Sequence, residues 1–149
     1  MPAVSRTNPS RQDALAQICR GHGVRSLYLF GSRAREATQW LRGERPALGS
    51  GGSDLDVAVL PDPARRWDIQ TKVRFAARLE DFFGVGRVDL GLLPEMDPFV
   101  AVEAIDGERV YAQDPDLADE YELYLLRRAG DLIPFERRRI NVLLGREEP

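Results

Sequence analysis

The order of apolar and polar positions along the chain predicts short strands that alternate with helices. Three segments are short, apolar and bounded by turn residues, as strands are: 24–30, 54–60 and 87–93. A fourth brief strand is expected at 108–112, directly after the turn Asp106-Gly107. Residues 68–83 instead place their apolar side chains three or four positions apart and end before Gly84, which predicts an amphipathic helix.

Capping residues place the other helices. Ser10 is a suitable N-cap for a helix through about Arg20, and Ser32 for a helix that follows the first strand. A short helix is expected near 98–105, and Asp114 followed by Pro115 predicts the start of a long last helix. The resulting order predicts an α/β (α+β) fold, with a short mixed sheet and flanking helices in a single domain.

Length and composition set the domain organisation. A chain of 149 residues that is 43% hydrophobic forms one domain of ordinary size. We expect a flexible lead-in at 1–9, the domain at 10–130 and a C-terminal tail at 131–149. In that tail, three consecutive arginines at 137–139 precede apolar residues, a pattern typical of a solvated face or of a partner-docking segment.

Several classes of protein are disfavoured by the composition. The single cysteine, Cys19, excludes an intramolecular disulfide, and the first residues lack the pattern of a secretory signal, so we expect a cytoplasmic protein. No apolar run approaches the roughly 18 to 20 residues that span a membrane. The net charge of −3 combines a positive first third, which can attract a polyphosphate, with an acidic remainder that argues against stable nucleic-acid binding.

Three aspartates form the most informative pattern. Asp54 and Asp56 are alternate residues at the start of a predicted strand, so their carboxylates share one face. Two unpaired acids on one face repel each other and lose hydration, a cost that divalent cations remove. If the next strand lies alongside, Asp89 completes a site for two ions about 3.5–4 Å apart. We therefore expect these three residues to bind metal and to be catalytic.

The turn after the first strand supplies a phosphate site. Gly31 permits close approach of the backbone, and the N–H groups that start the next helix, with the Ser32 hydroxyl, are suited to bind terminal phosphates. Arg33 and Arg35 stand nearby as phosphate clamps.

These motifs resemble a known family. GSRAR at 31–35, SDLDVAVLP at 53–61 and RVDL at 87–90 are similar to the polymerase-beta nucleotidyltransferase superfamily in its minimal single-domain branch, and more narrowly to MntA-like antitoxins that accompany HEPN-domain toxins. The resemblance runs from about Val24 to Phe135. It implies the polymerase-beta-like fold and transfer of AMP from ATP onto a tyrosine of the partner toxin, whose RNase is thereby silenced.

Roles for single residues follow from the resemblance. Asp54 and Asp56 would bind metal, while Asp89 would complete the site and help to activate the acceptor. The expected ions are two Mg²⁺, or Mn²⁺ in their place, with ATP as substrate and a HEPN toxin as partner in a hetero-oligomer. Together with the turn, the match gives the expected nucleotide-binding residues: Gly31, Ser32, Arg33, Arg35 and Ser53.

The sequence departs from the family pattern at two places. Glu36 stands where the family usually has glycine, and Asp54 follows Gly31 by 23 positions, a longer gap than usual, with an apparent insertion at 39–52. Two alternatives to the enzyme-antitoxin therefore stay open: an antitoxin that acts by stoichiometric binding without catalysis, and a nucleotidyltransferase acting on a small molecule or tRNA.

Overall fold

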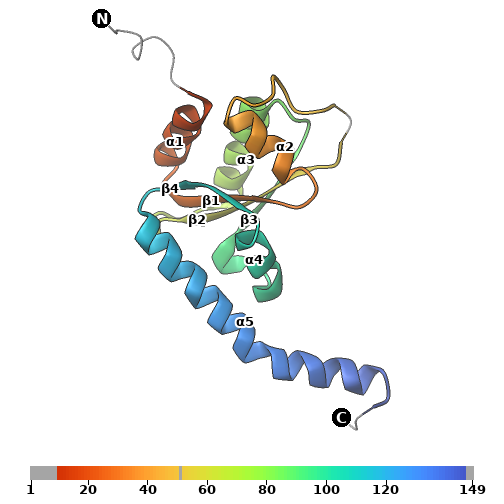
Figure 1. Cartoon of the computed structure of the whole chain (residues 1–149). Helices are drawn as coiled ribbons and strands as arrows, with labels where there is room; N and C mark the ends of the chain where they lie inside the picture. Colours follow the sequence, from red (N-terminus) through yellow and green to blue (C-terminus); the bar gives the residue numbers. More distant parts are fainter. Residues whose placement is uncertain (1–9, 51, 147–149) are drawn as a thin grey trace, which may run out of the picture.

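A four-stranded mixed sheet lies between two layers of helices in the computed structural model, which describes residues 10–50 and 52–146 (Figure 1). The strand order is β3-β2-β1-β4. Strand β1 (Val24–Phe30) runs antiparallel to β2 (Leu55–Pro61) and to β4 (Glu108–Ala112), whereas β2 runs parallel to β3 (Val88–Leu92). The mixed sheet confirms the sequence prediction, and the pairing of β2 with β3 meets the condition under which Asp89 joins Asp54 and Asp56. The predicted lead-in 1–9 lies outside the described residues.

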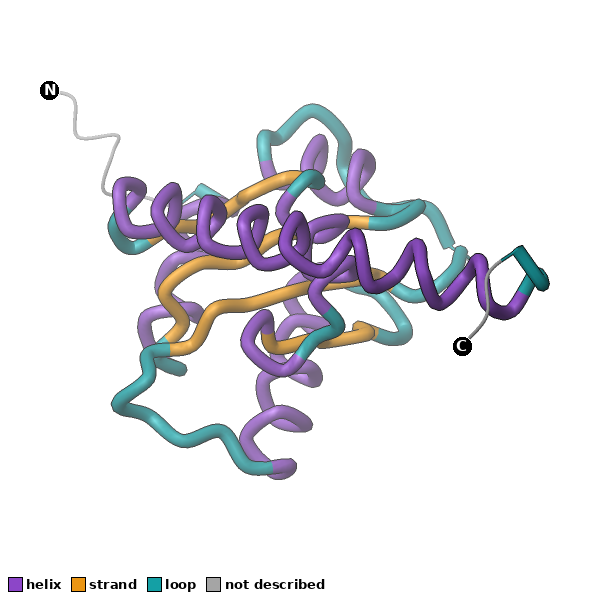
Figure 2. The backbone as a smooth tube through the Cα atoms, turned by 90° about the horizontal axis from the view of Figure 1, so that it is seen from below, coloured by secondary structure: helices purple, strands orange, loops and turns teal. Residues whose placement is uncertain are grey.

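The helices divide between the two faces of the sheet. On one face lie α1 (Arg11–Gly21), α2 (Ala34–Leu41) and α3 (Ile69–Phe83). On the other lie α4 (Pro98–Ile105) and the first half of α5 (Pro115–Leu143), which crosses the strands in Figure 2. A single turn of 3₁₀ helix, η2 (Leu93–Glu95), links β3 to α4.

The side chains of strand β2 alternate between the two faces of the sheet. Its residues Leu55, Val57 and Val59 are fully buried against α1, α2 and α3. Ala58 faces the opposite way and packs in the cluster formed with α4 and α5. Because side chains alternate along a strand, Asp56 shares the face of Ala58. The hydrophobic face thus holds β2 in place while its acidic side chain is directed toward the α4 side.

Local capping confirms most of the predicted helix boundaries. The side chains of Ser10, Asp68 and Asp114 each accept a backbone N–H at the start of α1, α3 and α5. The prediction that Ser32 caps the second helix is wrong. That helix begins at Ala34 with Arg33 as N-cap and without a side-chain cap, because the Ser32 hydroxyl is instead hydrogen-bonded to that of Ser53. Strand β2 also begins one residue later than predicted, at Leu55.

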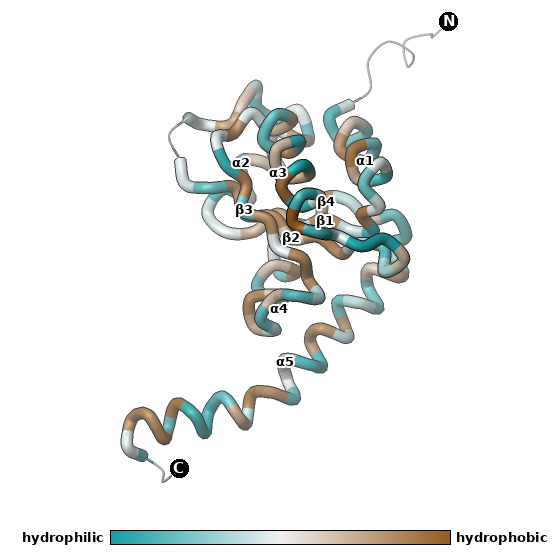
Figure 3. The backbone as a smooth tube through the Cα atoms, turned by 180° about the vertical axis from the view of Figure 1, so that it is seen from behind, coloured by the Kyte–Doolittle hydropathy of each residue, from teal (hydrophilic) through white to brown (hydrophobic). Residues whose placement is uncertain are grey.

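Helix α5 continues well beyond the sheet (Figure 1). Its last buried residue is Ala129, and the following turns extend away from the body (Figure 3). Several apolar side chains of these turns are exposed, among them Phe135, which is 73% exposed. The predicted boundary at residue 130 falls inside this helix, and the docking role of 131–149 stays a prediction. Among the helices that the structure describes, none is both long and apolar enough to cross a membrane.

A buried polar contact attaches α5 to the sheet. The Tyr28 hydroxyl, on a side chain only 1% exposed, donates to Glu122 Oε2 at 2.6 Å. Arg109 Nη1 of β4 donates to the same oxygen and to Asp119 Oδ1, both at 2.8 Å. Burial and the Glu122 carboxylate raise the pKa of Tyr28, so its hydroxyl keeps its proton and remains a donor.

Glu122→Ala should therefore destabilise the fold, since it leaves the buried Tyr28 hydroxyl without its acceptor. We expect the free energy of unfolding to fall by about 1–3 kcal/mol, measured by urea denaturation. Glu120→Ala, at an exposed neighbouring position, should change it by less than about 0.5 kcal/mol. Equal losses in both variants would contradict this role of Glu122.

Candidate active site

The three predicted aspartates come together at one end of the sheet. Asp54 directly precedes β2, Asp56 is its second residue and Asp89 is the second residue of β3. The parallel register pairs Asp56 with Asp89. Asp89 is exposed and Asp56 is partly buried, so the group opens to solvent at one side.

The electrostatic surroundings of Asp56 are negative. Burial raises the pKa of this carboxyl, and the charges of Asp89, Asp54 and Glu103 raise it further. Glu103 comes from α4 and was not singled out by the sequence pattern, because only the packing of α4 below this end of the sheet brings it near Asp56. A cation here would relieve repulsion among four carboxylates.

The donor set fits a hard divalent cation by its chemistry, since Mg²⁺ and Mn²⁺ prefer carboxylate oxygens. In the described part of the chain, however, no three His, Cys, Asp or Glu side chains are gathered closely enough to hold an ion as they stand. Asp54 Oδ2 instead lies 3.5 Å from Arg87 Nε. A metal would therefore compete with the Arg87 guanidinium for Asp54.

Gly31 packs directly against this group. Its φ is +75°, and a Cβ atom added there would lie 2.2 Å from Asp56 Oδ2. Glycine is thus required both by the left-handed backbone and by the closeness of the carboxylate. The next residue, Ser32, places its Oγ 2.8 Å from Ser53 Oγ, so two predicted nucleotide-binding residues meet beside Asp54.

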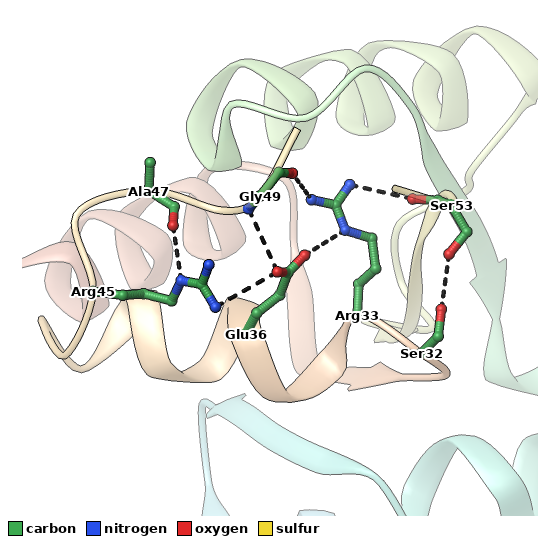
Figure 4. A network of polar contacts seen from close by, with 7 residues as sticks. All are labelled: Ser32, Arg33, Glu36, Arg45, Ala47, Gly49 and Ser53. Carbon is green, nitrogen blue, oxygen red and sulfur yellow. Dashed lines mark hydrogen bonds and ion pairs between the residues drawn. The ribbon is translucent and has the colours of Figure 1, made fainter. Parts of the chain in front are cut away.

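The two predicted phosphate clamps differ in their surroundings. Arg33 is buried, and its N–H groups donate to the Glu36 carboxylate and to the carbonyl oxygens of Gly49 and Ser53 (Figure 4). In this conformation Arg33 binds the protein itself, because a buried guanidinium needs such acceptors. Arg35 is exposed, and its side chain is therefore open to a ligand.

A cavity of about 560 Å³ adjoins the Gly31 turn. Arg35 lines it together with three acidic residues of the α4–β4 region, Glu103, Asp106 and Glu108. The site therefore combines a carboxylate group, a glycine-serine turn and an open cavity at the same end of the sheet. Such a combination can bind a polyphosphate with its metal ions and leave room for a second substrate.

Comparison with protein families gives a match over residues 13–116 to the model described as "Polymerase beta, Nucleotidyltransferase". No curated protein matches the sequence significantly.

Solved structures of toxin–antitoxin complexes contain chains of similar fold. One is a mutant of a pair named MntA-HpeT, with a TM-score of 0.66 and 17% identity over 89% of this chain and 98% of that chain. Another is a toxin–antitoxin with AMP-PNP, with a TM-score of 0.65 and 18% identity over 89% of this chain and 98% of that chain. A third is a tri-AMPylated Shewanella oneidensis HEPN toxin in complex with an MNT antitoxin, with a TM-score of 0.64 and 15% identity over 90% of this chain and 96% of that chain. At these low sequence identities the similarity shows a shared fold and nothing further.

The contact between Gly31 and Asp56 can be tested with a matched glycine. Gly84 has a φ of +70° but open space around its Cα, so Gly31→Ala and Gly84→Ala carry the same backbone strain of about 1–2 kcal/mol. Only Gly31→Ala displaces the Asp56 carboxylate. We expect it to weaken Mn²⁺ binding, followed by electron paramagnetic resonance, about 10- to 100-fold, with Gly84→Ala close to wild type. Equal Mn²⁺ affinities of the two variants would contradict a role of this contact in metal binding.

Glu36 should make stability depend on pH. The hydrogen bond from Arg33 is the main cause that lowers the pKa of Glu36 below its ordinary value of 4.5. Because the folded pKa is lower than the unfolded one, ionised Glu36 stabilises the fold above the unfolded pKa, and this stabilisation is lost as the pH falls through the folded pKa.

Wild type should therefore be more stable than Glu36→Gln at about pH 6, and the difference should shrink toward about pH 3. Urea unfolding of both proteins at the two pH values measures it. A difference that stays constant across this range would show that the charge of Glu36 has no part in its effect on stability.

Proposed function

The chain belongs to the polymerase beta nucleotidyltransferase family, and we propose that it is an antitoxin enzyme that transfers AMP from ATP to a tyrosine hydroxyl of a HEPN RNase toxin. The observation that carries the proposal is the packing of the Gly31 turn against Asp56, which itself pairs with Asp89. The similar structures with AMP-PNP and with a tri-AMPylated HEPN toxin support the choice of nucleotide and partner. Because the reaction consumes ATP, we place it in the cytoplasm.

The nucleotide would bind along the turn. Ser32 and Ser53 offer two hydroxyls 2.8 Å apart, which suits them to the terminal phosphates together with the N–H groups at the start of α2. Arg35, at the adjoining cavity, is free to reach a phosphate oxygen. Arg33 contributes indirectly, through the loop carbonyls that it already binds.

Asp54, Asp56 and Asp89 would hold two divalent ions, Mg²⁺ or Mn²⁺. When bound, such ions supply charge neutralisation at the phosphates and lower the pKa of the acceptor hydroxyl. To take part, Asp54 must give up its contact with Arg87.

The transfer is a displacement at the α-phosphorus of ATP. The tyrosine oxygen forms a bond to that phosphorus, the bond from it to the oxygen bridging to the β-phosphorus breaks, and pyrophosphate leaves. Asp89 accepts the tyrosine proton. Its exposure suits it to this role, since an acceptor on another protein has to approach from solvent.

A second candidate function is neutralisation of the toxin by stoichiometric binding. The observation that favours it is the half of α5 beyond Ala129, where Phe135 and Leu143 are mostly exposed and Ile133 partly so. Transfer to a small molecule or to tRNA stays a third hypothesis.

The proposal is tested by incubating the protein with α-labelled ATP, Mg²⁺ and the protein encoded by the neighbouring gene, where we expect the HEPN toxin. Asp56→Asn keeps the side-chain shape but removes the charge, so label transfer should fall at least about 100-fold. Asp81→Asn, on the exposed side of α3, is the matched control and should transfer like wild type.

Two outcomes would decide against this function. Wild type that labels no acceptor, or Asp56→Asn that labels as fast as wild type, contradicts AMP transfer. Asp56→Asn that transfers nothing yet still rescues cells from the toxin favours stoichiometric binding.

A further inference from the structure

Glu36 and the long loop between α2 and β2 are the two departures of this sequence from the family pattern, and the structure brings them into contact. The Gly49 N–H donates to Glu36 Oε2 at 3.4 Å, and Arg45 Nη1 lies 3.6 Å from the same oxygen (Figure 4). Arg45 Nε also donates to the carbonyl oxygen of Ala47 at 2.8 Å, which ties the loop to itself. The additional carboxylate on α2 therefore holds the additional stretch of chain.

Arg33 lies between Glu36 and the loop, with only 8% of its surface exposed. Its Nε donates to Glu36 Oε1 at 2.5 Å, while its two Nη atoms donate to the carbonyl oxygens of Gly49 at 2.5 Å and Ser53 at 3.2 Å. Glu36 balances the buried charge, and the loop carbonyls satisfy further N–H groups. The orientation of Arg33 and the position of the loop consequently determine each other.

The loop backbone also rests on the guanidinium. A Cβ atom added to Gly52 would lie 3.1 Å from Arg33 Nε, closer than ordinary van der Waals contact. The segment that leads into Ser53 and Asp54 is therefore seated on Arg33 by packing as well as by hydrogen bonds.

We infer that Arg33 and Glu36 are positioning residues that set Ser53 and Asp54 against the Gly31-Ser32 turn, so that both sides of the nucleotide site are aligned before ATP binds. The Ser53 carbonyl is held by Arg33, and its hydroxyl is held 2.8 Å from that of Ser32. Asp54 is the next residue. The inference rests on the proposed function only in taking Ser32, Ser53 and Asp54 as ligands of the nucleotide and its ions.

The anchoring is tested by hydrogen exchange followed by mass spectrometry. Glu36→Ala removes the carboxylate that binds Arg33 and Gly49, so amides at 43–50 should exchange about tenfold faster, as expected for the loss of a charge-assisted hydrogen bond. The matched control is Glu44→Ala, which removes an exposed carboxylate within the same loop and should leave exchange unchanged. If Glu36→Ala does not fold, the same measurement is made on Glu36→Gln, which keeps a hydrogen-bond acceptor for Arg33 but removes the charge.

The positioning role is tested by the affinity for α,β-methylene-ATP, which binds without transferring AMP. With MgCl₂ present, calorimetry should give a Kd about fivefold to tenfold higher for Glu36→Ala than for wild type, with Glu44→Ala unchanged. Unchanged exchange at 43–50 would overturn the anchoring. Faster exchange with an unchanged Kd would overturn the positioning role.

Neither measurement requires an acceptor protein. Wild type that labels no toxin would contradict the proposed transfer, whereas the exchange and affinity data would still decide whether Arg33 and Glu36 align the site.

Discussion

The parallel pairing of β2 with β3 is the constraint on which the site depends, because it places Asp56 opposite Asp89. Two carboxylates in neighbouring positions repel each other, and Asp54 and Glu103 add to that repulsion. The fold sustains this arrangement because the opposite face of β2 is fully buried through Leu55, Val57 and Val59. Burial of three such side chains contributes several kcal/mol, roughly 1.5–3 kcal/mol each, and this holds the acids together in spite of their charge.

Packing and acidic side chains occupy different positions along this one strand. One face of β2 is buried against α1, α2 and α3, whereas the other packs Ala58 in the cluster with α4 and α5 and carries Asp56 nearer the end of the sheet. A site of this kind stores unfavourable electrostatic energy that a cation can release on binding. The ion pair between Arg87 and Asp54 releases a small part of it, since Arg87 is mostly and Asp54 nearly half exposed, and ion pairs in contact with solvent are weak.

Much of the fold follows from the sequence because the signals are local. Alternating side chains place Asp54 and Asp56 on one face whatever the rest of the chain does, and caps such as Asp114 with Pro115 act within one helical turn. The same holds for Gly31, whose position between a strand and a helix indicates a turn before any tertiary contact is known.

The features that the sequence does not predict depend on contacts between residues that are distant along the chain. The composition of 43–53 predicts a loop but not that its Gly49 carbonyl meets Arg33, sixteen positions earlier. The spacing of Arg33 and Glu36 favours an ion pair on a helix, yet it gives no sign that the pair holds the loop. A serine after a strand predicts a helix cap because capping is the local use of its hydroxyl, whereas the hydroxyl of Ser32 is bonded to that of Ser53, which is distant in the sequence.

The long helix α5 connects this site to the free apolar surface. Its first half is attached to β1 by the contact between Tyr28 and Glu122, and β1 ends at Phe30, directly before the Gly31 turn. A protein bound to the turns beyond Ala129 would thus be held by a helix attached to the strand that leads into the Gly31 turn. Since α4 packs against both α5 and the sheet, the core would set the orientation of such a partner relative to Asp89.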